Sequence, residues 1–291
     1  MYLNTHSWFS LRYGVMSPEE LLAQAQAAGV TSMALTDVHC TAGGPDFARQ
    51  AAAFGIRPVL GVDFRRGAEQ LYVGLAQDHE GYAALCRFLS QLLLASRKPQ
   101  PPARAPQLPS VLWVYPLENA PRTGSLRPDE YLGLRPQDLD ALRIGLQTAP
   151  ENWPLEKLVA LHSATFRHKQ DHNAHRLLRA IDNNALLASL DRAPLGEAAT
   201  RKPPHRQVAP NTDRLLRTGE LEGAFCEFSW LLRASEKLLQ RCHIDFESEL
   251  DQAGLKHRNL QVYSETMESD RALLRGLCEE GLAYRYPDAE A

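Results

Sequence analysis

The sequence lacks the features of a secreted, membrane-spanning or strongly basic protein. Its five cysteines are odd in number and form no C-x-x-C pair, which argues against a disulfide framework and favours a reduced setting. No apolar run reaches the roughly 18 residues of a membrane span, and no basic-then-apolar leader begins the chain. The net charge of −3 excludes a global basic field, although a local basic patch remains compatible with it. We therefore expect a cytoplasmic protein without a membrane partner.

Several nucleotide- and acyl-transfer motifs are also missing. The chain has no Walker-type phosphate loop, no G-x-S-x-G nucleophile elbow and no dinucleotide-binding fingerprint. Its 291 residues are 44% hydrophobic and 23% charged, an ordinary balance for a globular protein. That length suits one barrel-sized domain, alone or with a small second unit.

Short apolar runs alternate with amphipathic stretches in the first half of the chain, a pattern that favours parallel β-α units. Ser17 and Glu20 form a capping box with Pro18 at the first helical position, and Gly29 ends that helix. We predict strands at 2–5, 31–36, 57–62, 70–75, 111–115 and 157–161, and helices at 18–28, 47–54, 79–95, 135–146 and 168–190. In the last of these helices we expect four apolar side chains to pack inward, namely Leu177, Leu178, Ile181 and Leu186.

Two proline-rich stretches interrupt this pattern. Residues 96–110 hold five prolines and read as a surface connection, and a second loose stretch follows at 192–213. Beyond it the pattern is purely helical, at 224–242 and 268–283. We therefore predict three parts: an α/β barrel domain at 1–191, a linker at 192–213 and a helical segment at 214–291.

Polar side chains with metal-binding chemistry follow several of the predicted strands, where ligands gather in parallel α/β folds. These candidates are His6, Asp37, His39, Asp63 and His162. Such a set could hold zinc or manganese and ionise a water for phosphate-ester hydrolysis. The alternative is that they are polar loop and cap residues. A helical triplet of histidines is open to the same two interpretations, as a metal face or as polar surface: His168, His172 and His175.

Four segments together resemble a known family. They are "YLNTHSWFSLRYG", "ALTDVHCTAGGPDFARQA", "GIRPVLGVDFR" and "LYVGLAQDHEGYAALCRFLS", and they occur in the order of the polymerase-and-histidinol-phosphatase (PHP) domain of the bacterial DNA polymerase III alpha subunit. The resemblance implies a distorted (β/α)7 TIM-like barrel with a small helical C-terminal extension leading towards the polymerase palm. It also implies that this chain is an N-terminal fragment. The magnesium-binding carboxylates of the parent DNA-directed DNA polymerase would lie downstream, so the fragment should not polymerise DNA.

The resemblance also places the family's metal ligands on this sequence. His6 and Asp63 fall on ligand positions and keep a metal-binding side chain, whereas His39 lies one position late. Neutral side chains replace the other ligands, at Asn4, Tyr13, Val38, Gln70, Ser163 and Thr165. Two ligands are fewer than the three or four protein donors that zinc usually takes. We therefore predict a barrel without a catalytic residue or cofactor; a retained zinc or manganese ion would have to use the five candidates named above.

The predicted role is structural. The barrel would support the rest of the alpha subunit, which contacts DNA, and offer a docking surface for a proofreading exonuclease. One alternative is an active metal-dependent 3′–5′ exonuclease or phosphoesterase with a residual site at the barrel mouth. A weaker alternative is a free-standing phosphoesterase of the histidinol-phosphatase kind, which the polymerase-like C-terminal helices disfavour.

Overall fold

The computed structural model describes residues 1–67, 69–95, 100–121, 125–190, 208–244 and 262–286. Its strands are β1 (Tyr2–Thr5), β2 (Ser32–Leu35), β3 (Arg57–Arg66), β4 (Glu69–Ala76), β5 (Val111–Pro116), β6 (Glu130–Leu134), β7 (Leu158–Ala160) and β8 (Ser163–Ala164). Its α-helices are α1 (Pro18–Ala27), α2 (Gly44–Ala51), α3 (His79–Ala95), α4 (Leu139–Thr148), α5 (Lys169–Asn183), α6 (Leu187–Leu190), α7 (Thr218–Ala224), α8 (Trp230–Gln240) and α10 (Met267–Arg285). Short 3₁₀ turns lie at Ala52–Phe54, Leu117–Asn119, Pro136–Asp138, Pro150–Asn152, Leu155–Lys157 and Cys226–Phe228.

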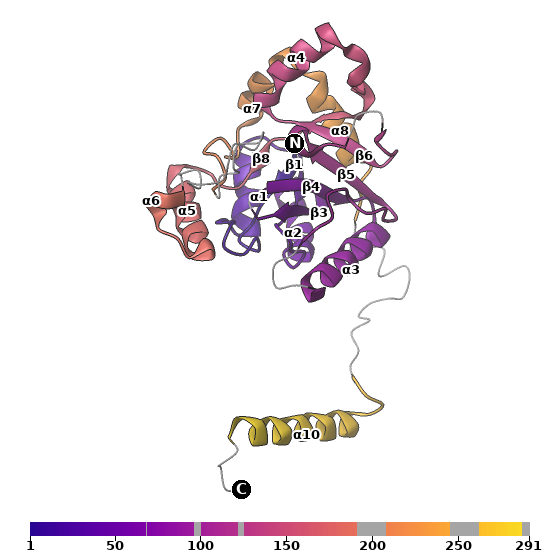
Figure 1. Cartoon of the computed structure of the whole chain (residues 1–291), viewed down its shortest axis with the longest axis vertical. Helices are drawn as coiled ribbons and strands as arrows, with labels where there is room; N and C mark the ends of the chain where they lie inside the picture. Colours follow the sequence, from indigo (N-terminus) through magenta and orange to yellow (C-terminus); the bar gives the residue numbers. More distant parts are fainter. Residues whose placement is uncertain (68, 96–99, 122–124, 191–207, 245–261, 287–291) are drawn as a thin grey trace, which may run out of the picture. The chain divides into compact units, whose positions relative to one another are not determined.

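The described strands form one sheet in the order β7-β6-β5-β4-β3-β2-β1-β8 (Figure 1). β7 and β8 stand at opposite ends of this order, although only two residues separate them in the chain. On one side the Leu161 N–H donates to the Leu134 carbonyl beside β6, and on the other the His6 N–H donates to the Ala164 carbonyl beside β1. β7 and β8 therefore act as one bent strand that closes the sheet. This confirms the predicted α/β, TIM-like barrel class.

One strand departs from the predicted parallel pattern. β4 is antiparallel to both β3 and β5, while the other pairings are parallel. The prediction that residues 70–75 continue a series of parallel β-α units is wrong because only two residues separate β3 from β4. A parallel crossover needs a dozen or more, whereas two suffice for a hairpin. Gly67 has a φ of +60°, a left-handed conformation that glycine adopts without strain in such a turn.

Strand alternation divides the core into two layers. Inside the barrel lies an apolar cluster that includes Leu3, Val59, Val114 and Leu161. A larger cluster lies between the strands and the surrounding helices. The side chains of β3 show the period of two, because Val59 joins the inner cluster while Leu60 belongs to the outer one. On the same strand, residues 63 and 65 share the inward parity of residue 59.

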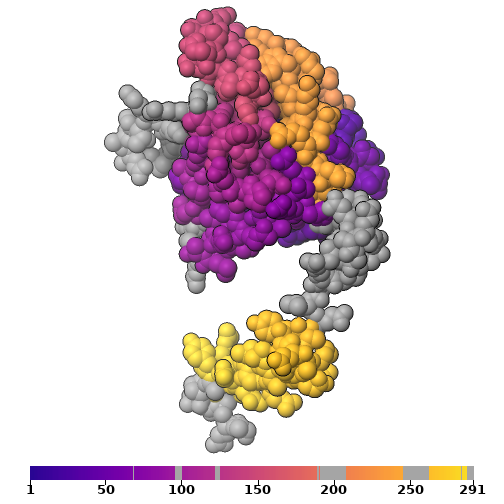
Figure 2. All heavy atoms as spheres, turned by 90° about the vertical axis from the view of Figure 1, so that its right-hand side faces the viewer, coloured from indigo at the N-terminus to yellow at the C-terminus, as the bar shows by residue number. Residues whose placement is uncertain are grey.

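Helix α8 covers the N-terminal end of the barrel. Its Leu238 and Leu239 join the inner apolar cluster. The hydroxyl of Ser32, at the start of β2, donates to Glu236 at 2.7 Å. Arg57, at the start of β3, donates to the Leu239 carbonyl at 3.0 Å. In Figure 2 the orange α7–α8 segment packs against the magenta and pink strand-bearing part of the chain.

The compact units differ from the predicted three parts. One unit comprises Met1–Phe246 and the other Glu247–Ala291. Helices α7 and α8 therefore belong to the barrel unit, because their apolar faces complete its core, and α10 lies in the second unit. Most of the predicted linker falls outside the described residues. No helix among the described residues is long and apolar enough to cross a membrane.

Helix α1 has the predicted N-terminus. The Ser17 hydroxyl accepts from the Glu20 N–H at 3.0 Å, and the Glu20 carboxylate accepts from the Ser17 N–H at 2.9 Å. Leu21 and Leu22 are fully buried. Helix α3 spans residues 79–95, as the apolar spacing predicts.

Helix α5 packs the opposite way from the prediction. It buries Asp171, His175 and Arg179, while Leu177 and Ile181 are 51% and 57% exposed. Leu178, also in α5, is half-buried. Leu186, in the turn that follows the helix, is 79% exposed. The prediction of inward packing is therefore wrong for Leu177, Ile181 and Leu186. The inward face meets the Tyr13 carbonyl and the Ala209 N–H together with the rings of Tyr13 and Phe166. The imidazole of His175 can satisfy these backbone groups, whereas a leucine side chain could not.

Candidate functional site at the barrel mouth

The carboxyl ends of the parallel strands meet at one rim of the barrel, and polar side chains fill its centre. Asp63 lies in β3 and is fully buried. Its Oδ2 accepts hydrogen bonds from His6 Nε2, Gln70 Nε2 and Arg65 Nε, each at 2.9 Å. A second nitrogen of Arg65, Nη2, lies 2.8 Å from the same oxygen. The donors around this one carboxylate oxygen therefore come from three neighbouring strands: His6 directly follows β1, Arg65 lies in β3 and Gln70 lies in β4.

Arg65 supplies a fixed positive charge at this position. It is two residues from Asp63 on the same inward face of β3, and it is 8% exposed. Its guanidinium carbon lies 4.6 Å from the centre of the Tyr13 ring, a cation–π contact. Burial alone would raise the pKa of Asp63, but the Arg65 charge and the His6 hydrogen bond hold it well below its usual range. Burial would lower the pKa of Arg65, yet Asp63 raises it above its ordinary value.

The tautomer of His6 follows from its two partners. Nε2 faces the Asp63 carboxylate, which can only accept, so Nε2 carries the proton. Nδ1 lies 2.9 Å from the Thr165 hydroxyl and accepts from it. Burial lowers the pKa of His6 further than Asp63 raises it, so the ring is neutral. Both nitrogens of this imidazole are therefore used within the protein.

Asp37 organises the loop that follows β1. Its Oδ1 accepts from the Ser7 N–H and the Ser10 hydroxyl, each at 2.7 Å, and its Oδ2 accepts from the Ser7 hydroxyl at 2.8 Å. Burial raises the pKa of Asp37 to about 6 against the lowering effect of these bonds. A side chain at Gly14 would overlap the Ser7 carbonyl, so glycine is required where the loop returns. Both oxygens of Asp37 are committed to loop structure.

The remaining two candidates also have partners of their own. His39, at a φ of +49°, accepts from the Arg65 N–H through Nε2 at 2.9 Å, and burial lowers its pKa to about 4. His162 Nε2 donates to the Arg214 carbonyl at 3.0 Å, and its ring lies beside that of Tyr2. Of the five predicted candidates, only His6 and Asp63 are joined through their side chains. Asp37 and His39 contact Asp63 through the backbone, because the Asp63 N–H donates to the Asp37 carbonyl and the His39 N–H donates to the Asp63 carbonyl.

The histidine triplet of α5 does not form a metal face. His168 caps the helix and accepts from the Asp171 N–H at 3.4 Å. His172 Nε2 donates to the Ala209 carbonyl at 3.1 Å. His175 is fully buried and bridges two backbone groups, donating to the Tyr13 carbonyl at 2.6 Å and accepting from the Ala209 N–H at 2.9 Å. These imidazoles join α5 to the barrel.

Several mouth residues escaped the sequence prediction. Arg65 is one, although its spacing from Asp63 on a strand was a signal that both point inward. Arg135, after β6, donates to Gln70 Oε1 at 2.7 Å and so extends the network to another strand. Asp213 is half-buried and its carbonyl accepts from the Thr165 N–H at 2.9 Å. Burial raises the pKa of its carboxyl to about 7, although Arg135 and Arg65 lower it.

The mouth holds a hydrogen-bonded network centred on Asp63, which Arg135 joins through Gln70. The Arg65 charge balances that of Asp63, and His6 and Gln70 are uncharged. In the part of the chain that the structure describes, no three histidine, cysteine, aspartate or glutamate side chains converge to hold a metal ion. The network fixes neighbouring strand ends relative to one another.

Residues 3–111 match the model of the PHP domain family. The chain is homologous to error-prone DNA polymerases and to the alpha subunit of DNA polymerase III. The error-prone DNA polymerase of Pseudomonas aeruginosa is 27% identical over 98% of this chain and 27% of the relative. DNA polymerase III subunit alpha of Bacillus subtilis is 34% identical over 33% of this chain and 9% of that protein. The chain therefore spans about a quarter or less of the length of these relatives.

One solved structure is similar over a shorter part. An amidohydrolase from Chromobacterium violaceum, with bound sulfate and no metal, is 31% identical over 31% of this chain and 32% of its own, with a TM-score of 0.27.

Proposed function

We propose that this chain is a catalytically silent PHP barrel that serves a DNA polymerase III-type alpha subunit as structural support and as a docking surface for a proofreading exonuclease. The observation that carries the proposal is the ion pair between Arg65 and Asp63. A guanidinium lies against one oxygen of the retained carboxylate, with its nitrogens 2.8 and 2.9 Å from Oδ2, while the buried Oδ1 has no hydrogen-bond partner among the described residues.

The contacts of the candidate ligands support the loss of metal chemistry. Zinc takes three or four protein donors, and a catalytic ion also needs an open position for water. Here His6 has both nitrogens bonded, Asp37 has both oxygens bonded, and Asp63 is paired with a permanent cation. An arginine cannot lose its charge to make room, because its pKa stays above the accessible range. These residues do not fit a zinc or manganese ion.

The inverted packing of α5 supports the docking part of the proposal. Leu177 and Ile181 face solvent from one side of the helix, and the exposed Leu186 follows it. Figure 1 shows α5 and α6 at the side of the strand-bearing part of the chain, away from α4 and α8. Exposed apolar side chains grouped on one element are typical of protein contact sites. We assign this surface to the exonuclease.

Two measurements test the proposal. The purified chain should hold no stoichiometric zinc, manganese or iron in elemental analysis, and it should not shorten single-stranded DNA when manganese or zinc is added. Manganese-dependent hydrolysis that disappears in His6→Ala would establish the exonuclease alternative instead.

A binding assay tests the docking surface separately. The proofreading exonuclease subunit should bind the wild-type chain, and the double variant Leu177→Ser, Ile181→Ser should bind at least tenfold more weakly. The control is Leu94→Ser on α3, since Leu94 is also highly exposed. Equal binding by all three folded proteins would refute the assignment of the surface, and no binding by any of them would refute the docking role.

A further inference from the structure

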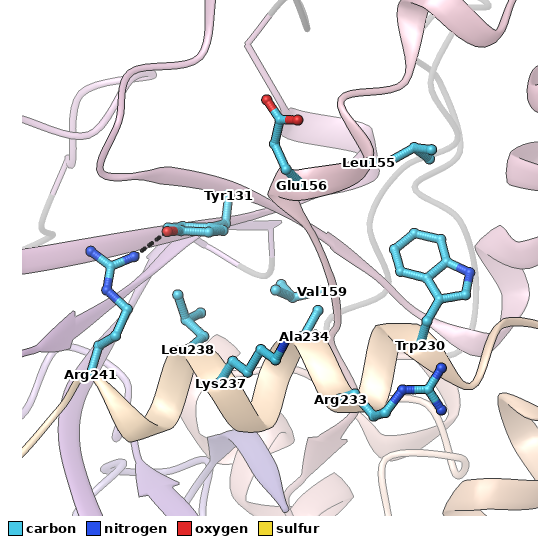
Figure 3. A pocket seen from close by; sticks show the side chains of 10 residues that line it. All are labelled: Tyr131, Leu155, Glu156, Val159, Trp230, Arg233, Ala234, Lys237, Leu238 and Arg241. Carbon is cyan, nitrogen blue, oxygen red and sulfur yellow. Dashed lines mark hydrogen bonds between the residues drawn. The ribbon is translucent and has the colours of Figure 1, made fainter.

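A basic hollow lies beside α8, which covers the end of the barrel opposite the mouth. Figure 3 shows the side chains that line this hollow. It has a volume of about 390 Å³ and is bounded by α8, by β6 and β7, and by the 3₁₀ turn before β7. Its lining combines cations with two aromatic rings: Tyr131, Leu155, Glu156, Val159, Trp230, Arg233, Ala234, Lys237, Leu238 and Arg241. The proposed function makes no use of this hollow.

The three cations of α8 form a regular row. Arg233, Lys237 and Arg241 are four residues apart, so they share one face of the helix at intervals of about 6 Å along its axis. All three are exposed. No carboxylate among the described residues lies within ion-pair distance of any of them. A row of cations without a carboxylate partner among the described residues, on a chain of net charge −3, is a local concentration of positive potential.

The neighbours of the row strengthen this field. Lys157 Nζ lies 4.7 Å from the centre of the Tyr131 ring, and Arg241 lies over the same ring at 5.9 Å while donating to its hydroxyl. Burial first, and then the charge of Arg241, lower the pKa of Lys157. The hollow has one acidic lining residue, Glu156, and in Figure 3 its carboxylate points away from α8. An anion entering the hollow would therefore meet cations on the α8 side.

We propose that this hollow binds a segment of single-stranded nucleic acid. Arg233, Lys237 and Arg241 would contact successive phosphates along the helix, and the half-buried ring of Trp230 would stack on a base. Proteins that bind single strands without sequence preference combine a positive groove with an aromatic platform. A small anion would need only one of the cations, and an acidic peptide would gain nothing from the ring. The inference does not rest on the proposed loss of metal chemistry.

The salt dependence of binding tests the row of cations. Fluorescence anisotropy of a short labelled oligo(dT) with the full chain should give a slope of log K against log salt near −2, about −0.7 for each of three phosphate contacts. The double variant Arg233→Gln, Lys237→Gln should reduce the slope to about −0.7. The control is Arg49→Gln, Arg87→Gln, which removes two exposed arginines from α2 and α3 and should leave the slope unchanged.

A second variant and three competitors complete the test. Trp230→Leu should weaken binding by about tenfold without changing the salt slope, because stacking releases no counterions. A duplex, inorganic tripolyphosphate and a polyglutamate peptide should each displace the oligonucleotide poorly at equal charge concentration. Efficient displacement by tripolyphosphate would redefine the hollow as a small-anion site and overturn the proposal, and efficient displacement by polyglutamate would overturn it in favour of an acidic protein. Absence of oligonucleotide binding, or equal loss in the control variant, would also overturn it.

Discussion

Acid should destabilise this protein through the buried imidazole of His175. The ring donates from Nδ1 to the Tyr13 carbonyl and accepts at Nε2 from the Ala209 N–H. Protonation of Nε2 would remove the acceptor and place a charge where no carboxylate neutralises it. Burial, only partly offset by the Tyr13 bond, lowers the pKa of His175 to about 3. The folded state therefore holds the ring neutral well below the pH at which the unfolded chain protonates it.

The size of the effect follows from the two pKa values. Because the pKa of His175 is depressed in the folded state, its contribution to stability is complete above the unfolded value of about 6.5 and is lost as pH falls towards 3. At pH 4.5, protonation of His175 stabilises the unfolded chain by the free energy that corresponds to nearly two pH units. It stabilises the folded chain by almost nothing, because the ring there is still neutral. The free energy of unfolding should thus fall by about 2.5 kcal/mol between pH 7 and pH 4.5 on account of this residue alone.

Urea unfolding at a series of pH values, followed by circular dichroism, measures this loss. His175→Gln keeps a donor and an acceptor on one side chain but does not titrate, so its stability should fall by about 2.5 kcal/mol less than that of the wild type over the same range. His243→Gln removes an exposed histidine and should follow the wild-type profile. Parallel profiles for wild type and His175→Gln would refute the reasoning.

Three further changes probe the scaffold. Arg65→Met should lower the free energy of unfolding in urea by about 3–5 kcal/mol by leaving Asp63 unpaired, and adding Asp63→Asn should recover part of that loss. Ser17→Ala should lower it by about 1 kcal/mol by removing the cap of α1, seen as a lower Tm. Gly133→Ala should cost about 1–3 kcal/mol in urea, because a Cβ on β6 would lie 2.7 Å from that of Leu161; an unchanged midpoint would mean that β7 can shift.

Much of the fold could be predicted from periodicity and capping, and the failures have physical causes. The spacing of apolar residues predicted the bounds of α3, and the Ser17 capping box predicted the start of α1. Periodicity could not predict the packing of α5, because its apolar face is the exposed one. What decides that orientation is the position of the Tyr13 carbonyl and the Ala209 N–H, far apart in the sequence. The antiparallel direction of β4 depended on a two-residue connection rather than on apolar spacing.

The candidate site could be predicted only in part. Strand ends converge in a barrel, and this convergence correctly brought His6 and Asp63 together. Sequence position alone could not show that Asp37 turns back to Ser7 and Ser10, since that depends on the conformation of the loop. Arg65 was available to the same argument, because a strand places residues two apart on one face. Arginine is not a metal ligand, so a pattern of metal-binding side chains does not include it.

Charge balance explains why Asp63 persists at a mouth of this composition. A buried carboxylate is costly unless a cation and hydrogen-bond donors compensate it. A metal ion does so and leaves positions open for water and substrate, whereas the guanidinium of Arg65 directs two donors at Asp63 and faces the Tyr13 ring. The charge of Arg65 offsets that of Asp63, and the neutral Gln70 adds a hydrogen bond to Oδ2. Asp63 thereby links residues on or next to three strands, since His6 follows β1, Arg65 lies on β3 and Gln70 lies on β4.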